Sequence, residues 1–215
     1  MPRYRAVLFD LDGTLIDSIR LILDSYHHTL AVHRLPPESD DHWLAGLGTP
    51  LWAQFAAYVH TPELMDAMVL TYREYNIAHH DTRVTVYPGV LDMIGALRRA
   101  GMTMGLVTSK TRVGAQRGLR LVGLEADMAV VVGADDVQRH KPDPEPVLYA
   151  ADALGVPVRE TIFVGDSRHD MLAGRAAGAA TGGVLWGPFD RAHLEPTAPD
   201  HWLERPDDLL RVLGL

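Results

Sequence analysis

The chain has 215 residues, of which 47% are hydrophobic and 22% charged, which is typical of a globular protein and excludes a collagen-like or disordered class. Its net charge of −8, without any basic run, argues against nucleic acid or an anionic membrane as a partner. It contains no cysteine, which excludes disulfides and thiolate metal sites and fits a reducing compartment. No apolar run is long enough for a signal-peptide core or a membrane span, so we expect a soluble, cytoplasmic protein.

Short apolar segments rich in β-branched residues alternate with segments of helical pattern along the chain. The predicted strands are Arg5–Asp10, Thr103–Thr108, Met128–Gly133, Thr161–Asp166 and Thr181–Trp186. Strands that alternate with helices predict βαβ units and a parallel sheet, and continuous apolar runs fit strands covered on both faces. The predicted fold class is therefore α/β, with a doubly wound parallel sheet.

A helical segment interrupts this alternation between about residues 16 and 85. Ser18–His33 and Pro62–Ile77 both carry apolar residues at helical spacing, and the segment contains no convincing strand. A helical block between the first strand and the rest of the sheet predicts an all-helical cap inserted into the core. We expect the core to comprise residues 1–15 and 85–215, and the cap residues 16–84.

Polar segments follow four of the predicted strands. They are Asp10–Thr14, Thr108–Lys110, Lys141–Pro144 and Gly165–Asp170. Taken singly, each has an ordinary explanation such as a turn, a helix cap or a solvated lysine. Ligands of open α/β sheets bind outside the carboxyl ends of the strands, so we expect all four segments to meet in one crevice.

In this order, the four segments resemble those of the haloacid dehalogenase superfamily, and within it the phosphatases with a helical cap after the first motif. Val86–Val90, Lys141–Pro146 and Val164–Gly178 are most similar to the phosphoglycolate phosphatases and to the inorganic pyrophosphatases of the same fold. The resemblance implies a Rossmann-like core and a magnesium-dependent phosphatase that acts on a small phosphorylated substrate. The chain departs from many relatives at Ser109, where they carry asparagine.

The resemblance implies a role for each acidic residue. Asp10 would be the nucleophile, forming an aspartyl-phosphate that divides one difficult step into two. Asp12 would be the general acid for the leaving oxygen and then the base for water. Asp10, Asp166 and the backbone carbonyl of Asp12 would bind Mg²⁺, a hard cation that prefers oxygen ligands. Asp170 lies one helical turn past Asp166 and would orient metal-bound waters and Lys141.

The phosphoryl oxygens need donors and positive charge. Thr108 is expected to donate its hydroxyl to them, together with backbone N–H groups at the start of the following helix. Ser109, beside it, is a further candidate, and Lys141 would supply a fixed positive charge. Gly13 would let the backbone approach the phosphate without a Cβ in the way.

Specificity is expected to lie in the cap. Gly48 and Thr49 belong to a stretch with two glycines and a proline between helical segments, which suggests a shaped loop over the active site. A plain turn between helices is the alternative for this loop. The core residues do not distinguish 2-phosphoglycolate, the first choice of substrate, from inorganic pyrophosphate, the alternative, because both present the same phosphoryl group.

Other protein classes fit the sequence less well. A phospho-receiver domain has no helical insert of this size, and the dehalogenases of the superfamily lack the second aspartate, which is Asp12 here. The sugar-phosphate mutases show an acidic residue at the position of Gly165. Zinc is disfavoured because cysteine ligands are absent, and the pairs His27-His28 and His79-His80 are expected to face solvent.

Overall fold

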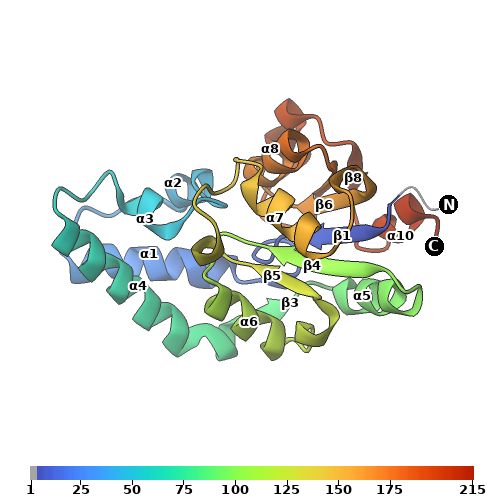
Figure 1. Cartoon of the computed structure of the whole chain (residues 1–215). Coiled ribbons are helices and arrows are strands. Elements are labelled where there is room, and N and C mark those ends of the chain that lie inside the picture. Colours follow the sequence, from blue (N-terminus) through green and yellow to red (C-terminus); the bar gives the residue numbers. More distant parts are fainter. Residues whose placement is uncertain (1–3) are drawn as a thin grey trace.

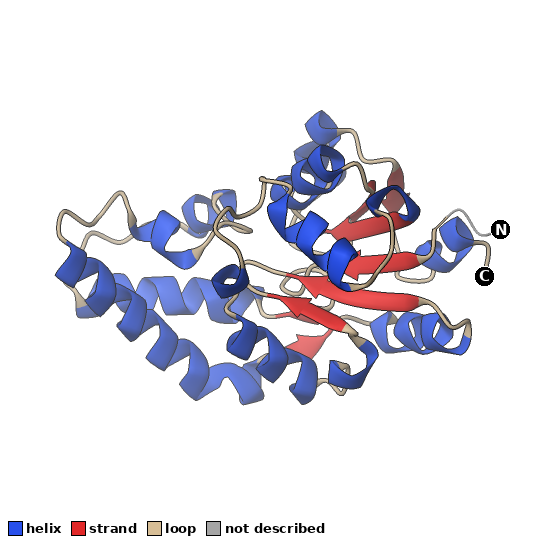
Figure 2. Cartoon of the chain, in the orientation of Figure 1, coloured by secondary structure: helices blue, strands red, loops and turns tan. Residues whose placement is uncertain are grey.

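Six parallel strands form a sheet in the order β5-β4-β1-β6-β7-β8 in the computed structural model, which describes residues 4–215 (Figures 1 and 2). Residues 1–3 of the expected core lie outside this range. The strands are β1 (Ala6–Phe9), β4 (Thr103–Val107), β5 (Val130–Val132), β6 (Thr161–Gly165), β7 (Ala180–Val184) and β8 (His201–Leu203). Because β4 pairs with one edge of β1 and β6 with the other, the strand order reverses at β1. The predicted α/β fold class is confirmed.

Helices cover both faces of this sheet. One face carries α5 (Val90–Arg99), α6 (Arg112–Leu121) and α10 (Asp208–Leu213), and the other carries α7 (Glu145–Ala153) and α8 (Arg168–Ala177). The remaining core elements are the short helix α9 (Arg191–Leu194) and the 3-10 turns Glu125–Asp127, Ala134–Asp136, Val158–Glu160 and Glu195–Thr197. The sheet is therefore doubly wound, as expected from its continuous apolar strands.

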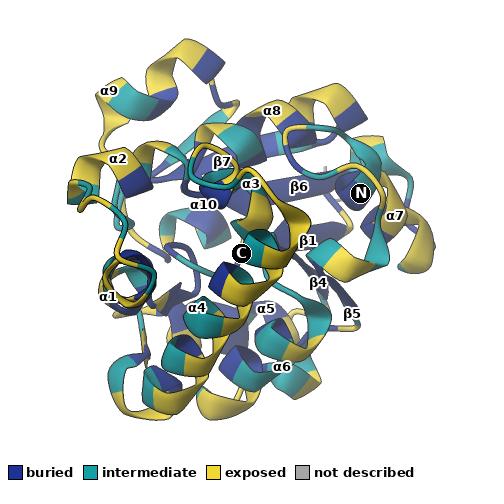
Figure 3. Cartoon of the chain, turned by 90° about the vertical axis from the view of Figure 1, so that its left-hand side faces the viewer, coloured by how far each residue is buried: buried dark blue, intermediate teal, exposed yellow. Residues whose placement is uncertain are grey.

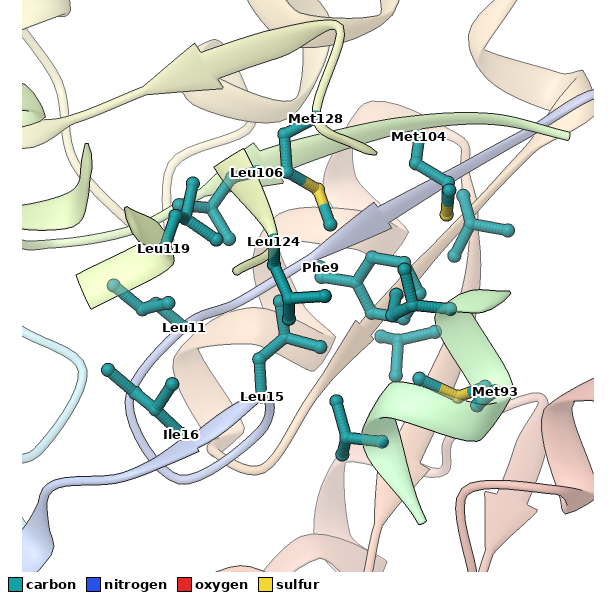
Figure 4. Packing of buried hydrophobic residues seen from close by; sticks show 14 of the residues in the cluster. Phe9, Leu11, Leu15, Ile16, Met93, Met104, Leu106, Leu119, Leu124 and Met128 are labelled. Atoms are coloured by element: carbon teal, nitrogen blue, oxygen red, sulfur yellow. The ribbon is translucent and has the colours of Figure 1, made fainter. Parts of the chain in front are cut away.

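The central strand contributes side chains to two hydrophobic clusters, because successive residues of a strand face opposite sides of the sheet. Phe9 belongs to one cluster with Met93 of α5, and Figure 4 shows side chains of several elements meeting around it. Leu8 belongs to the second cluster, together with Phe163 of β6. Both faces of β1 are completely buried, which fixes the position of the residues that follow it.

The sixth strand was missed by the sequence analysis. β8 pairs in parallel with β7 at the edge of the sheet, Gly182 opposite His201 and Val184 opposite Leu203. Of its three residues only Leu203 is buried. A strand of only three residues, two of them not buried, lacks the continuous apolar run that marked the others.

The inserted segment is helical, as predicted. It comprises α1 (Ile19–Val32), α2 (Asp40–Ala45), α3 (Leu51–Phe55) and α4 (Pro62–Arg83), and α1 packs along α4 (Figure 1). These helices enclose a hydrophobic cluster of their own, which includes Tyr26, Trp43 and Phe55. Figure 3 shows exposed, intermediate and buried stretches following one another along α4, as expected for a helix with one face against a core. Among residues 4–215 no helix combines the length and apolarity needed to cross a membrane.

Two details of the insert differ from expectation. It begins at the two-residue strand β2 (Ile16–Asp17) and ends at β3 (Thr85–Val86), which pair antiparallel, so the interpretation of this segment as strand-free was wrong at its edges. His80 is 3% exposed and its Nδ1 lies 2.8 Å from Asp81 Oδ1, so it does not face solvent. Residues 16–84 remain our proposed cap, and 1–15 with 85–215 our proposed core.

Candidate active site

Asp10 directly follows β1 and lies at the centre of a buried charge cluster. Its backbone N–H donates to Val164 O of β6 at 2.9 Å, which holds it at the end of the sheet. Lys141 Nζ donates to Asp10 Oδ1 at 2.9 Å and to Asp170 Oδ1 at 2.6 Å. The three side chains are 8% exposed or less. The loop after β5 and the helix after β6 therefore supply the partners of Asp10, as the strand-end argument predicts.

Burial has a large effect on Asp10. It raises the pKa of this carboxyl from 3.8 to about 7, opposed by the positive charge of Lys141 and reinforced by the negative charge of Asp170. The same neighbours act on Lys141, whose pKa is raised by Asp10 and Asp170 against the effect of burial. Lys141 is therefore a permanent positive charge, and it favours the ionised form that a nucleophilic carboxylate requires.

Asp166 follows β6 and is 1% exposed. Thr14 donates its hydroxyl to Asp166 Oδ1 at 2.9 Å, but Asp166 Oδ2 is buried and finds no hydrogen-bond partner among residues 4–215. Burial, followed by the charges of Asp170 and Asp10, raises the pKa of Asp166 well above its ordinary value. A buried carboxylate oxygen without a donor is unfavourable unless a cation binds it.

Asp10, Asp166 and Asp170 each offer an oxygen, and these oxygens all lie within 4.8 Å of one another. Three carboxylates and no nitrogen or sulfur ligand suit a hard divalent cation. The unpartnered oxygen of Asp166 is a second indication of a missing ligand, so the residues fit a metal site. The sequence analysis expected Asp170 to orient metal-bound waters and Lys141; its Oδ1 accepts a hydrogen bond from Lys141, and its side chain is also part of this cluster.

The side chain of Asp12 lies outside the three-carboxylate cluster. Its Oδ1 accepts a hydrogen bond from Lys110 Nζ at 2.6 Å and another from the hydroxyl of Ser18. Both donors were missed by the sequence analysis, which gave neither a role. Lys110 could have been found, because a lysine directly after two hydroxyl residues at a strand end places positive charge beside the expected phosphate.

Thr108 and Ser109 follow β4 and line the same cavity as the aspartates. Thr108 Oγ1 accepts the backbone N–H of Lys110 at 3.2 Å, which leaves its proton free for a ligand. The helix α6 begins only at Arg112, so Thr108 is not a helix cap, and Thr111 fills that position. Ser109 donates its hydroxyl to the backbone oxygen of Gly48 in the cap, at 2.5 Å.

Two glycines allow close approaches at the site. Gly13 has φ of +85°, and a Cβ there would lie 2.4 Å from Asp166 Oδ2, so glycine is required for Asp166 to reach its position. Gly48 has φ of +93°, and a Cβ there would lie 2.9 Å from Ser167 Oγ. The cap loop thus lies directly on the core. Thr49 beside it donates its hydroxyl to Gly46 O, at 2.7 Å within the loop.

A cavity of about 570 Å³ lies between the cap and the strand ends. The catalytic candidates Asp10, Asp12, Thr108, Ser109, Lys141 and Asp166 line it from the core, and Gly48 and Thr49 line it from the cap. Gly13 and Asp170 do not line it: Gly13 allows the close approach of Asp166, and Asp170 accepts a hydrogen bond from Lys141. The position of this cavity, at the point where the strand order reverses, is the one expected of a ligand site in an open α/β sheet.

A buried carboxylate at a strand end, a lysine bonded to it and a carboxylate cluster that could hold a metal are the arrangement expected of a phosphohydrolase active site. The model of the haloacid dehalogenase-like hydrolase family matches residues 7–184. The chain therefore belongs to the haloacid dehalogenase-like hydrolases. The resemblance seen in the sequence is confirmed, and the chain is a phosphatase of this family.

Relatives place the chain within the family. Proteins named pyrophosphatase PpaX, from Anoxybacillus flavithermus and Bacillus velezensis, are both 42% identical to it; the matches cover 97% and 99% of the chain and 96% and 98% of the relatives. A solved haloacid dehalogenase-like hydrolase from Bacteroides fragilis has a TM-score of 0.89 at 26% identity, covering 96% of this chain and 99% of that one. A Haemophilus somnus structure described as a predicted phosphoglycolate phosphatase shares the fold, with a TM-score of 0.90 at 24% identity over 99% of both chains. The branch is that of PpaX pyrophosphatases and phosphoglycolate phosphatase-like proteins.

Proposed function

We propose that the protein is a magnesium-dependent inorganic pyrophosphatase that works through an aspartyl-phosphate on Asp10. The choice of pyrophosphate as the substrate is supported by the 42% identity, over nearly the whole chain, to relatives named pyrophosphatase. This reverses the order of the two substrates weighed from the sequence, in which 2-phosphoglycolate came first. The second candidate stays 2-phosphoglycolate, since a Lactobacillus plantarum structure at 27% identity and a TM-score of 0.86 is described as a phosphoglycolate phosphatase by prediction.

Aspartates also line the cavity, but its cationic side chains could pair with an anionic substrate at both of its ends. Four cationic side chains line it, those of Arg73, Lys110, Arg117 and Lys141. Lys141 faces the nucleophile and Lys110 faces Asp12, so positive charge lies on both sides of the bond to be broken. A pyrophosphate carries charge on both of its halves and matches this distribution.

Magnesium is the proposed occupant of the carboxylate site. Asp10, Asp166 and Asp170 would hold it, and the backbone carbonyl of Asp12 is a further proposed ligand. When bound, Mg²⁺ would neutralise the phosphoryl oxygens and the buried carboxylates. The remaining chemistry belongs to the side chains.

In the first half of the reaction, an oxygen of Asp10 attacks the nearer phosphorus. A P–O bond to Asp10 forms while the bond from this phosphorus to the bridging oxygen breaks, and the second phosphate leaves. Thr108 and Lys141 hold the oxygens of the transferred group. Asp12 delivers a proton to the departing oxygen.

In the second half, water attacks the phosphorus of the aspartyl-phosphate. The bond between phosphorus and Asp10 breaks, and Asp12 takes the proton from the water. The sum is one pyrophosphate and one water giving two phosphates, with Asp10 and Asp12 restored. Lys110 and Ser18 fix the carboxyl of Asp12 during both steps, through the hydrogen bonds they donate to it.

The test is a comparison of kcat/KM for pyrophosphate, 2-phosphoglycolate and several sugar phosphates, with Mg²⁺ present. We expect pyrophosphate to exceed every other substrate by at least about 10-fold, an ordinary margin for a specificity difference. An Asp10→Asn protein purified in the same way measures the background. A preference for 2-phosphoglycolate would establish the second candidate, and a preference for a sugar phosphate would exclude both.

A further inference from the structure

Tyr26 of α1 is a buried residue with an unused hydroxyl at the wall of the cavity. Its exposed fraction is 4%, and it lines the cavity with Asp10 and Asp12. Among residues 4–215 no hydrogen bond is found for its hydroxyl, although other buried hydroxyls of α1, those of Ser25 and Thr29, bond to backbone oxygens. Tyr26 Oη is not one of the polar atoms that residues 4–215 leave fully buried without a partner, so it keeps access to the cavity and is available to a ligand there.

The ring of Tyr26 is held on several sides. It stacks on Trp43 with a centroid distance of 4.3 Å and an angle of 6°, and Phe55 packs edge-on at 5.6 Å. Tyr72 of α4 packs against it at 4.8 Å. A ring fixed in this way presents its hydroxyl without losing further conformational freedom when a ligand binds.

The charge state of Tyr26 suits a donor. Burial raises the pKa of this phenol well above its ordinary value, and the negative charge of Asp12 raises it further. The hydroxyl therefore stays protonated across the working range of pH. Tyr26 belongs to α1 of the proposed cap and lines the cavity opposite the strand ends that would hold the transferred phosphoryl group, so the leaving half of the substrate would lie on its side.

We propose that the Tyr26 hydroxyl donates a hydrogen bond to an oxygen of the leaving half of the substrate and is a specificity-determining residue. The proposal rests on the proposed function, in which that half is a phosphate rich in acceptor oxygens. A substrate whose leaving group offers no acceptor near the scissile bond leaves this hydroxyl unpaired. Sites built around a buried donor discriminate strongly against such substrates.

Tyr26→Phe tests the proposal, because it keeps the ring and its packing and removes only the oxygen. Tyr58→Phe is the matched control: Tyr58 also packs on Trp43, at 5.7 Å, but its hydroxyl bonds His42 and it does not line the cavity. The kinetic substrates are pyrophosphate and p-nitrophenyl phosphate, whose aromatic leaving group has no acceptor close to the phosphate. Inhibition by methylenediphosphonate, which is not cleaved, measures binding alone.

We expect Tyr26→Phe to lower kcat/KM for pyrophosphate by about 10- to 100-fold, the range for a hydrogen bond to a charged group. The inhibition constant of methylenediphosphonate should rise by a similar factor, while p-nitrophenyl phosphate should change by less than about 3-fold. Tyr58→Phe should leave all three values within about 2-fold.

An equal loss on both substrates would assign Tyr26 a purely structural role, and no loss on either would remove it from the site. Both results overturn the proposal. Failure of the proposed function looks different, since the wild-type protein would then be inactive on pyrophosphate. In that case the loss of kcat/KM in Tyr26→Phe is compared between the best substrate of the wild-type protein and p-nitrophenyl phosphate. A larger loss on the best substrate supports the proposal.

Discussion

The core and the cap use burial for opposite purposes. In the core, the charged residues Asp10, Lys141, Asp166 and Asp170 are all buried. In the cap, the largest buried side chains are apolar and aromatic, among them Trp43 and Phe55. The core buries charge around the reacting atoms, and the cap buries rings that shape the space above them.

The difference follows from the cost of each kind of burial. A buried ion pair loses so much hydration that it adds little to stability, and removing one partner leaves an uncompensated charge. The core bears this cost because Lys141 satisfies two carboxylates and the remaining Asp166 oxygen suits a cation. Aromatic rings gain free energy on burial and hold a fixed geometry without charge. This difference fits our proposal that the strand ends carry the chemistry and that the cap selects the leaving group.

The largest effect is expected when the negative charge of Asp10 is removed from the core. Asp10→Asn keeps the shape of the side chain and removes the nucleophile, so kcat should fall by at least about 10³-fold. The thermal transition should remain cooperative. Asp17→Asn changes an exposed aspartate of the same segment and should retain activity. Retention of more than a few per cent activity in Asp10→Asn contradicts a covalent mechanism.

Metal binding and proton transfer should separate within the core. Asp166→Ala removes a carboxylate of the three-carboxylate cluster, so the Mg²⁺ concentration for half-maximal activity should rise by at least about 10-fold. Asp12→Asn keeps its backbone carbonyl and should change that concentration by less than about 3-fold, while kcat falls by about 10²- to 10⁴-fold. Titrations of activity against Mg²⁺ measure both. Equal metal dependence in the two variants would show that the assigned roles are wrong.

A smaller effect is expected where the cap loop lies on the core. Gly48→Ala adds a Cβ at φ of +93° and 2.9 Å from Ser167 Oγ, and it disturbs the loop that Ser109 holds. We expect kcat/KM to fall unequally among substrates, by differences of ~1–2 kcal/mol, with p-nitrophenyl phosphate affected least.

The control for this prediction is Gly155→Ala. Gly155 also has positive φ, +65°, but a Cβ there meets nothing within 4 Å, so this variant reports backbone strain alone. Thr49→Ala removes only a hydrogen bond inside the loop and should have a weaker effect than Gly48→Ala. If Gly48→Ala lowered all substrates by one common factor, the loop would be structural rather than selective.

The smallest effect concerns an ion pair that joins cap and core. Arg117 of α6 donates two hydrogen bonds to Asp81 of α4, at 2.9 and 3.0 Å. These bonds, with a smaller contribution from His80, lower the pKa of Asp81 from 3.8 to about 2. A carboxyl whose pKa is lowered on folding stabilises the protein above pH ~4, and this contribution is lost as the pH falls toward 2.

Asp81→Asn should therefore lower Tm by about 1–3 °C at pH 7, a small shift because the pair is half exposed. The difference from wild type should shrink by pH 3. Thermal melts at both pH values measure this difference in Tm. Asp152→Asn is the control, since Asp152 is exposed and has no ion pair among residues 4–215. A difference of the same size at both pH values would assign the effect to packing instead.

The sequence by itself determined the positions of the core chemistry. Asp10, Thr108, Lys141 and Asp166 could be brought together because each follows a buried apolar strand, and the carboxyl ends of parallel strands share one edge of a sheet. The central strands and the long helices of the cap were predictable for a similar reason, since their apolar spacing is a local property of the chain. The substrate order was not predictable, because the core motifs are common to both candidates.

Only the tertiary structure decided which partner each side chain meets. Lys110 reaches Asp12 from 98 positions away, Asp170 turns into the carboxylate cluster, and His80 is buried against the core. Tyr26 could be assigned to a helix from its spacing, but its place at the cavity wall, with its ring against Trp43 and Phe55, could not. Spacing along a helix or strand sets which face a residue occupies, whereas its partners depend on how separate elements pack, and that geometry is absent from local sequence.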